Sequence, residues 1–76
     1  MKREFFLKKL QEALEEDEPI SIDTLFSTLD NYDSMSIMIL IAFIDENFNM
    51  QIPASKFKEI KDVDDLINSI GVDHFD

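Results

Sequence analysis

The sequence has no cysteine, no tryptophan, one glycine, two prolines and one histidine among its 76 residues. Without cysteine it has no disulfide, no thiolate metal ligand and no thiol nucleophile of its own. The only histidine, His74, lies near the end of the sequence, in a segment that we expect to fray, so a serine–histidine triad is excluded. A chain this short buries a small core and has little room for an enclosed catalytic cleft. We therefore expect no catalytic activity of its own.

Long apolar runs are also missing. No stretch approaches the roughly eighteen consecutive apolar residues of a membrane span, and residues 1–16 lack the continuous apolar core of a signal peptide. The sequence therefore predicts a cytoplasmic protein that does not enter the membrane.

Basic residues are scarce and unevenly placed. The net charge is -10, and residues 10–55 contain ten acidic residues and no lysine or arginine. Such a field repels nucleic acid and anionic membrane surfaces, and it favours partners with basic surfaces. The acidic residues do not form a recognisable metal site: Asp62, Asp64 and Asp65 lack the glycine and the terminal glutamate of an EF-hand loop. Adjacent carboxylates such as Asp45 and Glu46 point to different faces of a helix, so we expect solvated surface groups.

Helical periodicity dominates the rest of the sequence. Apolar residues recur at helical spacing from Phe6 to Leu14, which predicts a helix from Lys2 to Glu16 that Pro19 ends. Residues 19–33 mix apolar residues with turn formers and fit an ordered loop held to the core by its apolar side chains.

Two further helices have clear start signals. Asp33 is a good N-cap for a helix from Ser34 to Phe48. Asp62 precedes apolar residues at helical spacing, which predict a last helix with Asp65 in its first turn and Gly71 as its C-cap. Pro53 opens a short helix or turn between them. The fold class is therefore all-α: a small four-helix bundle of three main helices and one short helix, with a long ordered loop between helices 1 and 2, forming a single domain over residues 1–76.

The helix over 34–48 is apolar on two faces. One stripe, assigned to the core, comprises Ile37, Leu40, Ile41, Ile44 and Phe48. The second comprises Met35, Met38, Ile39 and Ala42. This second stripe is either an exposed docking face or part of a wider core; we favour docking, since methionine adapts well to partner surfaces.

Ser34 has a distinctive position, because it follows Asp33 at the start of this helix and comes directly after a loop. A phosphate on its hydroxyl would lie against the unpaired amides and the positive dipole end of the helix. The Asp-Ser pair alone is a weak signal, and an ordinary capping segment has the same sequence.

A longer pattern is more specific. The stretch DSMSIMILIAFIDENFNMQIPASKFKEIKDV, from Asp33 to Val63, resembles the acyl carrier proteins without a gap. It has Asp-Ser followed by a bulky apolar residue, a helix that ends in an acidic pair and Phe, then Ile-Pro and a short segment that ends Ile-x-x-Val. Phe26, eight residues before the serine, matches the loop anchor of that family.

The resemblance implies that Ser34 carries covalent 4'-phosphopantetheine, taken from coenzyme A by a phosphopantetheinyl transferase, with Asp33 orienting the site. The thiol of that arm would carry an acyl group as a thioester between loading and transferring enzymes. This borrowed thiol would supply the reactive group that the chain itself lacks.

The sequence also departs from that family. The family commonly has Leu-Gly-x before Asp-Ser, where this sequence has Asp30, Asn31 and Tyr32. Housekeeping fatty-acid carriers present acidic residues where this sequence has Ser36 and Ile39. These departures favour a specialised pathway, for a polyketide, peptide or surface-glycan acyl group, over bulk fatty-acid synthesis.

We expect partners to dock on the second stripe and its acidic rim. The predicted partner-binding residues are Met35, Met38, Ile39 and Ala42, with Asp30, Asp33, Asp45 and Glu46 around them. The protein should be a monomer, with weak dimers possible through the exposed methionines.

Other functions remain open from the sequence. A carrier of an amino acid belongs to the same class. Two alternatives belong to other classes. One is an unmodified acidic helical adaptor that binds a partner through the second helix. The other is an acidic decoy for a nucleic-acid-binding protein.

Overall fold

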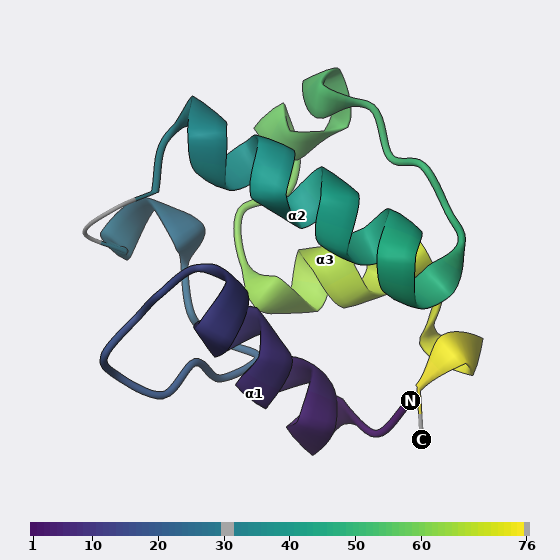
Figure 1. The fold of residues 1–76 in the computed structure, drawn as a ribbon, viewed down its shortest axis with the longest axis horizontal. Helices are drawn as coiled ribbons and strands as arrows, with labels where there is room; N and C mark the ends of the chain where they lie inside the picture. Colours follow the sequence, from purple (N-terminus) through teal and green to yellow (C-terminus); the bar gives the residue numbers. More distant parts are fainter. Residues whose placement is uncertain (30–31, 76) are drawn as a thin grey trace.

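Three α-helices and three short 3-10 turns make up the computed structural model (Figure 1), which describes residues 1–29 and 32–75. The elements, in chain order, are α1 (Arg3–Ala13), η1 (Phe26–Thr28), α2 (Ser34–Phe48), η2 (Ala54–Lys58), α3 (Val63–Ile70) and η3 (Val72–His74). No β-strand occurs in these two ranges. The predicted all-α class, with three main helices and a short one, is therefore confirmed, and the short helix is the 3-10 turn η2.

The first helix ends earlier than predicted, at Ala13 rather than Glu16. Glu15 adopts a left-handed conformation, with φ of 54°, and turns the chain. Its backbone N–H donates to the Glu12 carbonyl at 3.1 Å, and that of Glu16 donates to the Gln11 carbonyl at 3.1 Å. These two bonds satisfy carbonyls that the end of the helix leaves unpaired. The prediction that Pro19 ends the helix is therefore wrong, because the chain has already turned at Glu15.

In the described part of the loop between α1 and α2, only some of the apolar side chains are buried. Ile20 and Phe26 are buried, whereas Ile22 and Leu25 are 40% and 45% exposed. The sequence predicts that apolar side chains alone hold this loop to the core. Backbone hydrogen bonds also hold it.

These backbone hydrogen bonds join the loop to the start of α3. The Phe26 N–H donates to the Lys61 carbonyl at 3.0 Å, and the Asp64 N–H donates to the Ile22 carbonyl at 3.0 Å. Asp62 caps α3 by accepting from the Asp65 N–H at 2.8 Å. The loop that precedes the candidate serine is thus fixed to the third helix.

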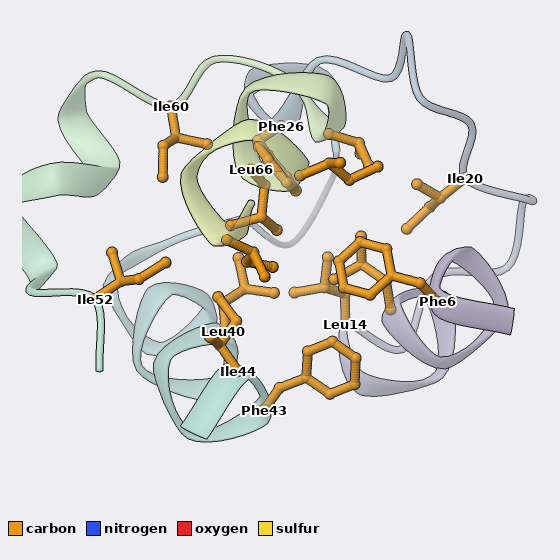
Figure 2. Packing of buried hydrophobic residues seen from close by; sticks show 14 of the residues in the cluster. Phe6, Leu14, Ile20, Phe26, Leu40, Phe43, Ile44, Ile52, Ile60 and Leu66 are labelled. Carbon is orange, nitrogen blue, oxygen red and sulfur yellow. The ribbon is translucent and has the colours of Figure 1, made fainter. Parts of the chain in front are cut away.

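The core face of α2 differs from the predicted stripe. Leu40 and Ile44 are fully buried, as expected, but Phe43 is also buried, while Ile37 and Ile41 are only partly covered. Figure 2 shows Phe6 of α1 and Phe43 of α2 lying close together, and their ring centroids are 5.7 Å apart. This aromatic contact rotates α2 so that Phe43 faces α1. Phe48, at the end of the predicted stripe, is also only partly buried.

The C-terminal segment is docked, which corrects the prediction that the region of His74 frays. Phe75 is 8% exposed, and its ring centroid lies 5.0 Å from that of Phe6. The His74 ring packs edge-on against Phe48, with centroids 5.8 Å apart. The amino group of Met1 donates to the His74 carbonyl at 2.8 Å. Aromatic packing with α1 and α2 therefore orders this segment.

Across residues 1–29 and 32–75, none of the helices has both the length and the apolar character needed to cross a bilayer. In the same residues, no group of three or more histidine, cysteine, aspartate or glutamate side chains is placed to hold a metal ion.

Candidate functional site

Ser34 is the first residue of α2 and is exposed. Its side chain makes no hydrogen bond to the described residues. The positive end of a 15-residue helix lies beside it, where an attached anion is stabilised. The serine thus combines an accessible hydroxyl with a setting suited to a phosphate.

A capping box holds the backbone on either side of Ser34. The Ser36 N–H donates to Asp33 Oδ1 at 3.0 Å, and the Asp33 N–H donates to Ser36 Oγ at 3.2 Å. Each side chain therefore satisfies an amide of the other residue, which is the geometry that fixes the start of a helix. Asp33 is confirmed as the N-cap, and Ser36 is buried here as its reciprocal partner.

Two groups that could act as a base for Ser34, the His74 ring and the Asp33 carboxylate, are both engaged elsewhere. The histidine ring packs on Phe48, at the opposite end of α2, and a helix of this length separates its two ends by about 20 Å. The neighbouring Asp33 carboxylate is engaged in the cap. Among residues 1–29 and 32–75, neither the histidine nor this carboxylate is thus free to act as a base at Ser34.

The second apolar stripe of α2 lies on the surface. Met35 and Met38 are 68% and 69% exposed, and Ile39 and Ala42 are exposed as well. The wider-core alternative is wrong. Asp45 and Glu46 are both exposed near the far end of the helix. The structure thus brings Ser34 and this apolar face together on one helix, while Asp30, predicted for the rim, lies outside the described residues.

Two hollows adjoin this face. An open groove of about 550 Å³ runs between α2 and the segment before η2, with Met38, Ala42 and Pro53 among its lining residues. A smaller hollow of about 180 Å³ lies between the end of α1 and the start of α2, with Asp33 and Met35 on its wall. The apolar face is therefore uneven, and grooves adjoin it on two sides.

A third pocket, next to the loop, did not emerge from the sequence. It measures about 370 Å³ and is lined by Leu25, Phe26, Ser27, Tyr32, Ile60 and Lys61. Residues 25–27 and Tyr32 are close in the chain, whereas residues 60–61 are far from both. The available signal was Tyr32, the only tyrosine in the sequence, which stands immediately before the Asp-Ser pair.

The cap leads to a prediction about the order of the site. Asp33→Ala should lower the free energy of unfolding by about 1 kcal/mol, because it removes the side-chain acceptor for the Ser36 amide. Asp33→Asn should retain most of the stability, since its carbonyl oxygen can still accept. Urea denaturation measures both. Equal losses in the two variants would mean that charge, rather than capping, is what Asp33 contributes.

Comparison with known proteins identifies the family. The family model described as "Phosphopantetheine attachment site" matches residues 4–70, and no solved structure gives a significant match. Such an attachment site implies covalent 4'-phosphopantetheine, which provides a thiol when it is bound. The residues present fit this group, because Ser34 offers an exposed hydroxyl, with no hydrogen bond to residues 1–29 or 32–75, at a helix start that stabilises a phosphate. The chain belongs to the family of phosphopantetheine-binding carrier domains, which have no catalytic activity of their own.

Proposed function

We propose that Ser34 is the residue that carries 4'-phosphopantetheine, and that a phosphopantetheinyl transferase installs it from coenzyme A. The observation that carries this proposal is the exposed Ser34 hydroxyl at the capped start of α2, within the matched residues 4–70. On modification, the Ser34 hydroxyl oxygen forms a bond to the phosphorus next to the pantetheine, the P–O bond of the coenzyme A pyrophosphate breaks, and adenosine 3',5'-bisphosphate leaves. A base of the transferase takes the hydroxyl proton, and the product is a phosphodiester. The ester's negative charge then lies at the positive end of α2.

The experiment that tests this proposal is intact mass spectrometry after incubation with coenzyme A and a broad-specificity phosphopantetheinyl transferase. A gain of one phosphopantetheine is expected. The second candidate, an unmodified acidic adaptor, is favoured only by the exposed apolar face of α2, which would serve an adaptor equally well. The adaptor would gain support if the protein gained no mass with the broad enzyme and also none in extract of its own cells.

The same face of α2 is the proposed docking surface for the transferase and the acyl-handling enzymes. The apolar centre of this surface comprises Met35, Met38, Ile39 and Ala42. Its negative border comprises Asp33, Asp45 and Glu46. Burial of exposed apolar side chains stabilises a complex, while the negative border attracts a basic rim on the partner. We expect partners with an apolar patch surrounded by lysine and arginine, and not nucleic acid or membrane.

Substitutions within this face should separate docking from folding. Met38→Glu and Ile39→Glu should each lower kcat/KM of the transferase about tenfold or more, because central interface residues commonly contribute about 2 kcal/mol. Both side chains are exposed, so the thermal midpoint should change little. Val72→Glu, which adds the same charge at an exposed apolar residue of η3, is the matched control and should retain full rate. Equal rates in all three variants would contradict docking at this face.

The cargo that we propose is an acyl group of fatty-acid-like or specialised biosynthesis, such as a polyketide, peptide or surface-glycan pathway. Support for a specialised pathway comes from Ser36 and Ile39, which replace acidic residues common in housekeeping fatty-acid carriers. Ser36 is used in the cap and Ile39 is exposed. The cytoplasm is the compartment that we propose. Intact mass of the protein purified from its own cells would identify the attached cargo.

A further inference from the structure

The apolar face of α2 carries two of the four methionines of the chain. Met35 and Met38 are 68% and 69% exposed, whereas Met1 and Met50 are partly buried and pack against the core. The other two members of the face have hydrocarbon side chains, which hydrogen peroxide does not oxidise, and the chain has no cysteine or tryptophan. The two exposed thioethers are therefore the side chains of this face that a peroxide reaches and oxidises.

Each of these thioethers lies beside a different hollow. Met35 lines the hollow of about 180 Å³ at the end of α1, together with Asp33. Met38 lines the open groove of about 550 Å³, together with Asp45. Met35 is also the residue directly after Ser34. A chemical change in the two methionines would therefore alter both hollows and the immediate surroundings of the proposed attachment residue.

The smaller hollow offers a sulfoxide little compensation. The oxygen of a sulfoxide accepts hydrogen bonds and donates none. The described side chains that line this hollow are hydrocarbon, thioether or carboxylate groups, apart from Ser36, whose hydroxyl donates to Asp33 Oδ1 at 3.2 Å. The new oxygen would therefore depend on water, and covering it with the apolar patch of a partner would cost the free energy of a buried, unpaired polar group.

We propose that Met35 and Met38 form a reversible oxidation site that controls docking at this face, with a hydroperoxide as the oxidant. The methionine sulfur forms a bond to one oxygen of hydrogen peroxide and loses two electrons, the O–O bond breaks, and the leaving hydroxide takes the remaining proton and departs as water. Methionine sulfoxide reductases reverse the change with two electrons and two protons from thiols, and the oxygen departs as water. This inference rests on the proposed docking surface and adds its regulation.

The test uses the whole chain before loading, when the thiol of the arm is not yet present to be oxidised. The chain is treated with hydrogen peroxide, the peroxide is removed, and coenzyme A and the transferase are then added. Intact mass counts the added oxygen atoms, and tandem mass spectrometry locates them. We expect oxygen at Met35 and Met38 before Met1 and Met50, an unchanged thermal midpoint, and kcat/KM of the transferase about tenfold lower. Both epimer-specific sulfoxide reductases, with dithiothreitol as reductant, should restore the rate.

Leucine variants assign the effect to these side chains, because leucine is apolar, similar in size to methionine and free of sulfur. The rate of each variant after peroxide is divided by its own rate before peroxide, so that any effect of the substitution itself cancels. The double variant with Met35→Leu and Met38→Leu should keep its rate after peroxide. Met50→Leu is the matched control and should lose as much of its rate as the wild type does.

The outcomes keep this inference apart from the proposals on which it rests. Full rate in a wild-type chain that carries both sulfoxides, or equal losses in the wild type and the double leucine variant, would overturn the oxidation site and leave docking intact. A thermal midpoint lowered by oxidation, or sulfoxides that are reduced without recovery of the rate, would also overturn it. Full rates in Met38→Glu and Ile39→Glu would overturn docking, and the oxidation site with it. No gain of mass in the untreated chain would overturn attachment at Ser34 first.

Discussion

Replacing Ser34 by alanine should abolish the gain of phosphopantetheine completely. The reason is chemical: the arm is attached through a side-chain oxygen, and the methyl group of alanine has none. Stability should hardly change, because the Ser34 side chain is exposed and makes no hydrogen bond to the described residues. Intact mass spectrometry of both proteins, after incubation with coenzyme A and the transferase, measures the loss.

Ser36 provides the matched control for this loss, since it lies two residues further along the same turn. Ser36→Ala removes one half of the capping box and should lower the free energy of unfolding by up to about 1 kcal/mol. It should still gain the full mass, because its hydroxyl is buried at the cap and Ser34 remains. A mass gain in Ser34→Ala would show that another residue is the attachment point.

Local signals explain why two of the three helices could be predicted closely. Asp33 and Asp62 each accept from an amide three residues later, and Gly71 has a φ of 116° that suits glycine. These features depend only on nearby residues, so the sequence alone reveals them. The end of α1 had no such signal, because Glu15, which turns the chain, is not a residue type expected in a left-handed conformation.

Long-range packing explains what the sequence could not predict. The helix α2 is apolar on most sides, so its pattern does not single out the core face, and contact between Phe43 and Phe6 decides it. Phe75 likewise orders the C-terminal segment through Phe6, a partner near the other end of the chain.

Part of the candidate site could likewise be predicted from local sequence, and part depends on long-range packing. Ser34 and Asp33 lie within one short motif, so both could be proposed from the sequence. The pocket at Tyr32 forms only where residues 25–27 and Tyr32 meet the distant residues 60–61, so its volume could not be inferred from spacing. Exposure of Met35 and Met38 was predicted correctly, although only the position of the core face decides between a docking surface and a wider core.

Phe6 should be the most sensitive core position. Its side chain is fully buried, and its ring lies 5.7, 6.0 and 5.0 Å from those of Phe43, Phe48 and Phe75. The Phe6 ring thus connects α1 with two rings of α2 and with the ring of Phe75 in the C-terminal segment. Phe6→Ala should lower the free energy of unfolding by about 3–5 kcal/mol, through lost burial and the cavity that remains.

This loss is large compared with the stability of so small a domain, about 4–11 kcal/mol at 0.05–0.15 kcal/mol per residue. The thermal midpoint should fall by more than about 12 °C. Phe5→Ala is a matched control in the adjacent position: that ring is 52% exposed and has the Lys9 ammonium 5.2 Å from its centroid, so its loss should be about 1 kcal/mol or less. Thermal denaturation of both variants, followed by circular dichroism, provides the comparison. Similar losses at the two positions would contradict the burial of Phe6 and, with it, the aromatic contact that orients α2 and its serine.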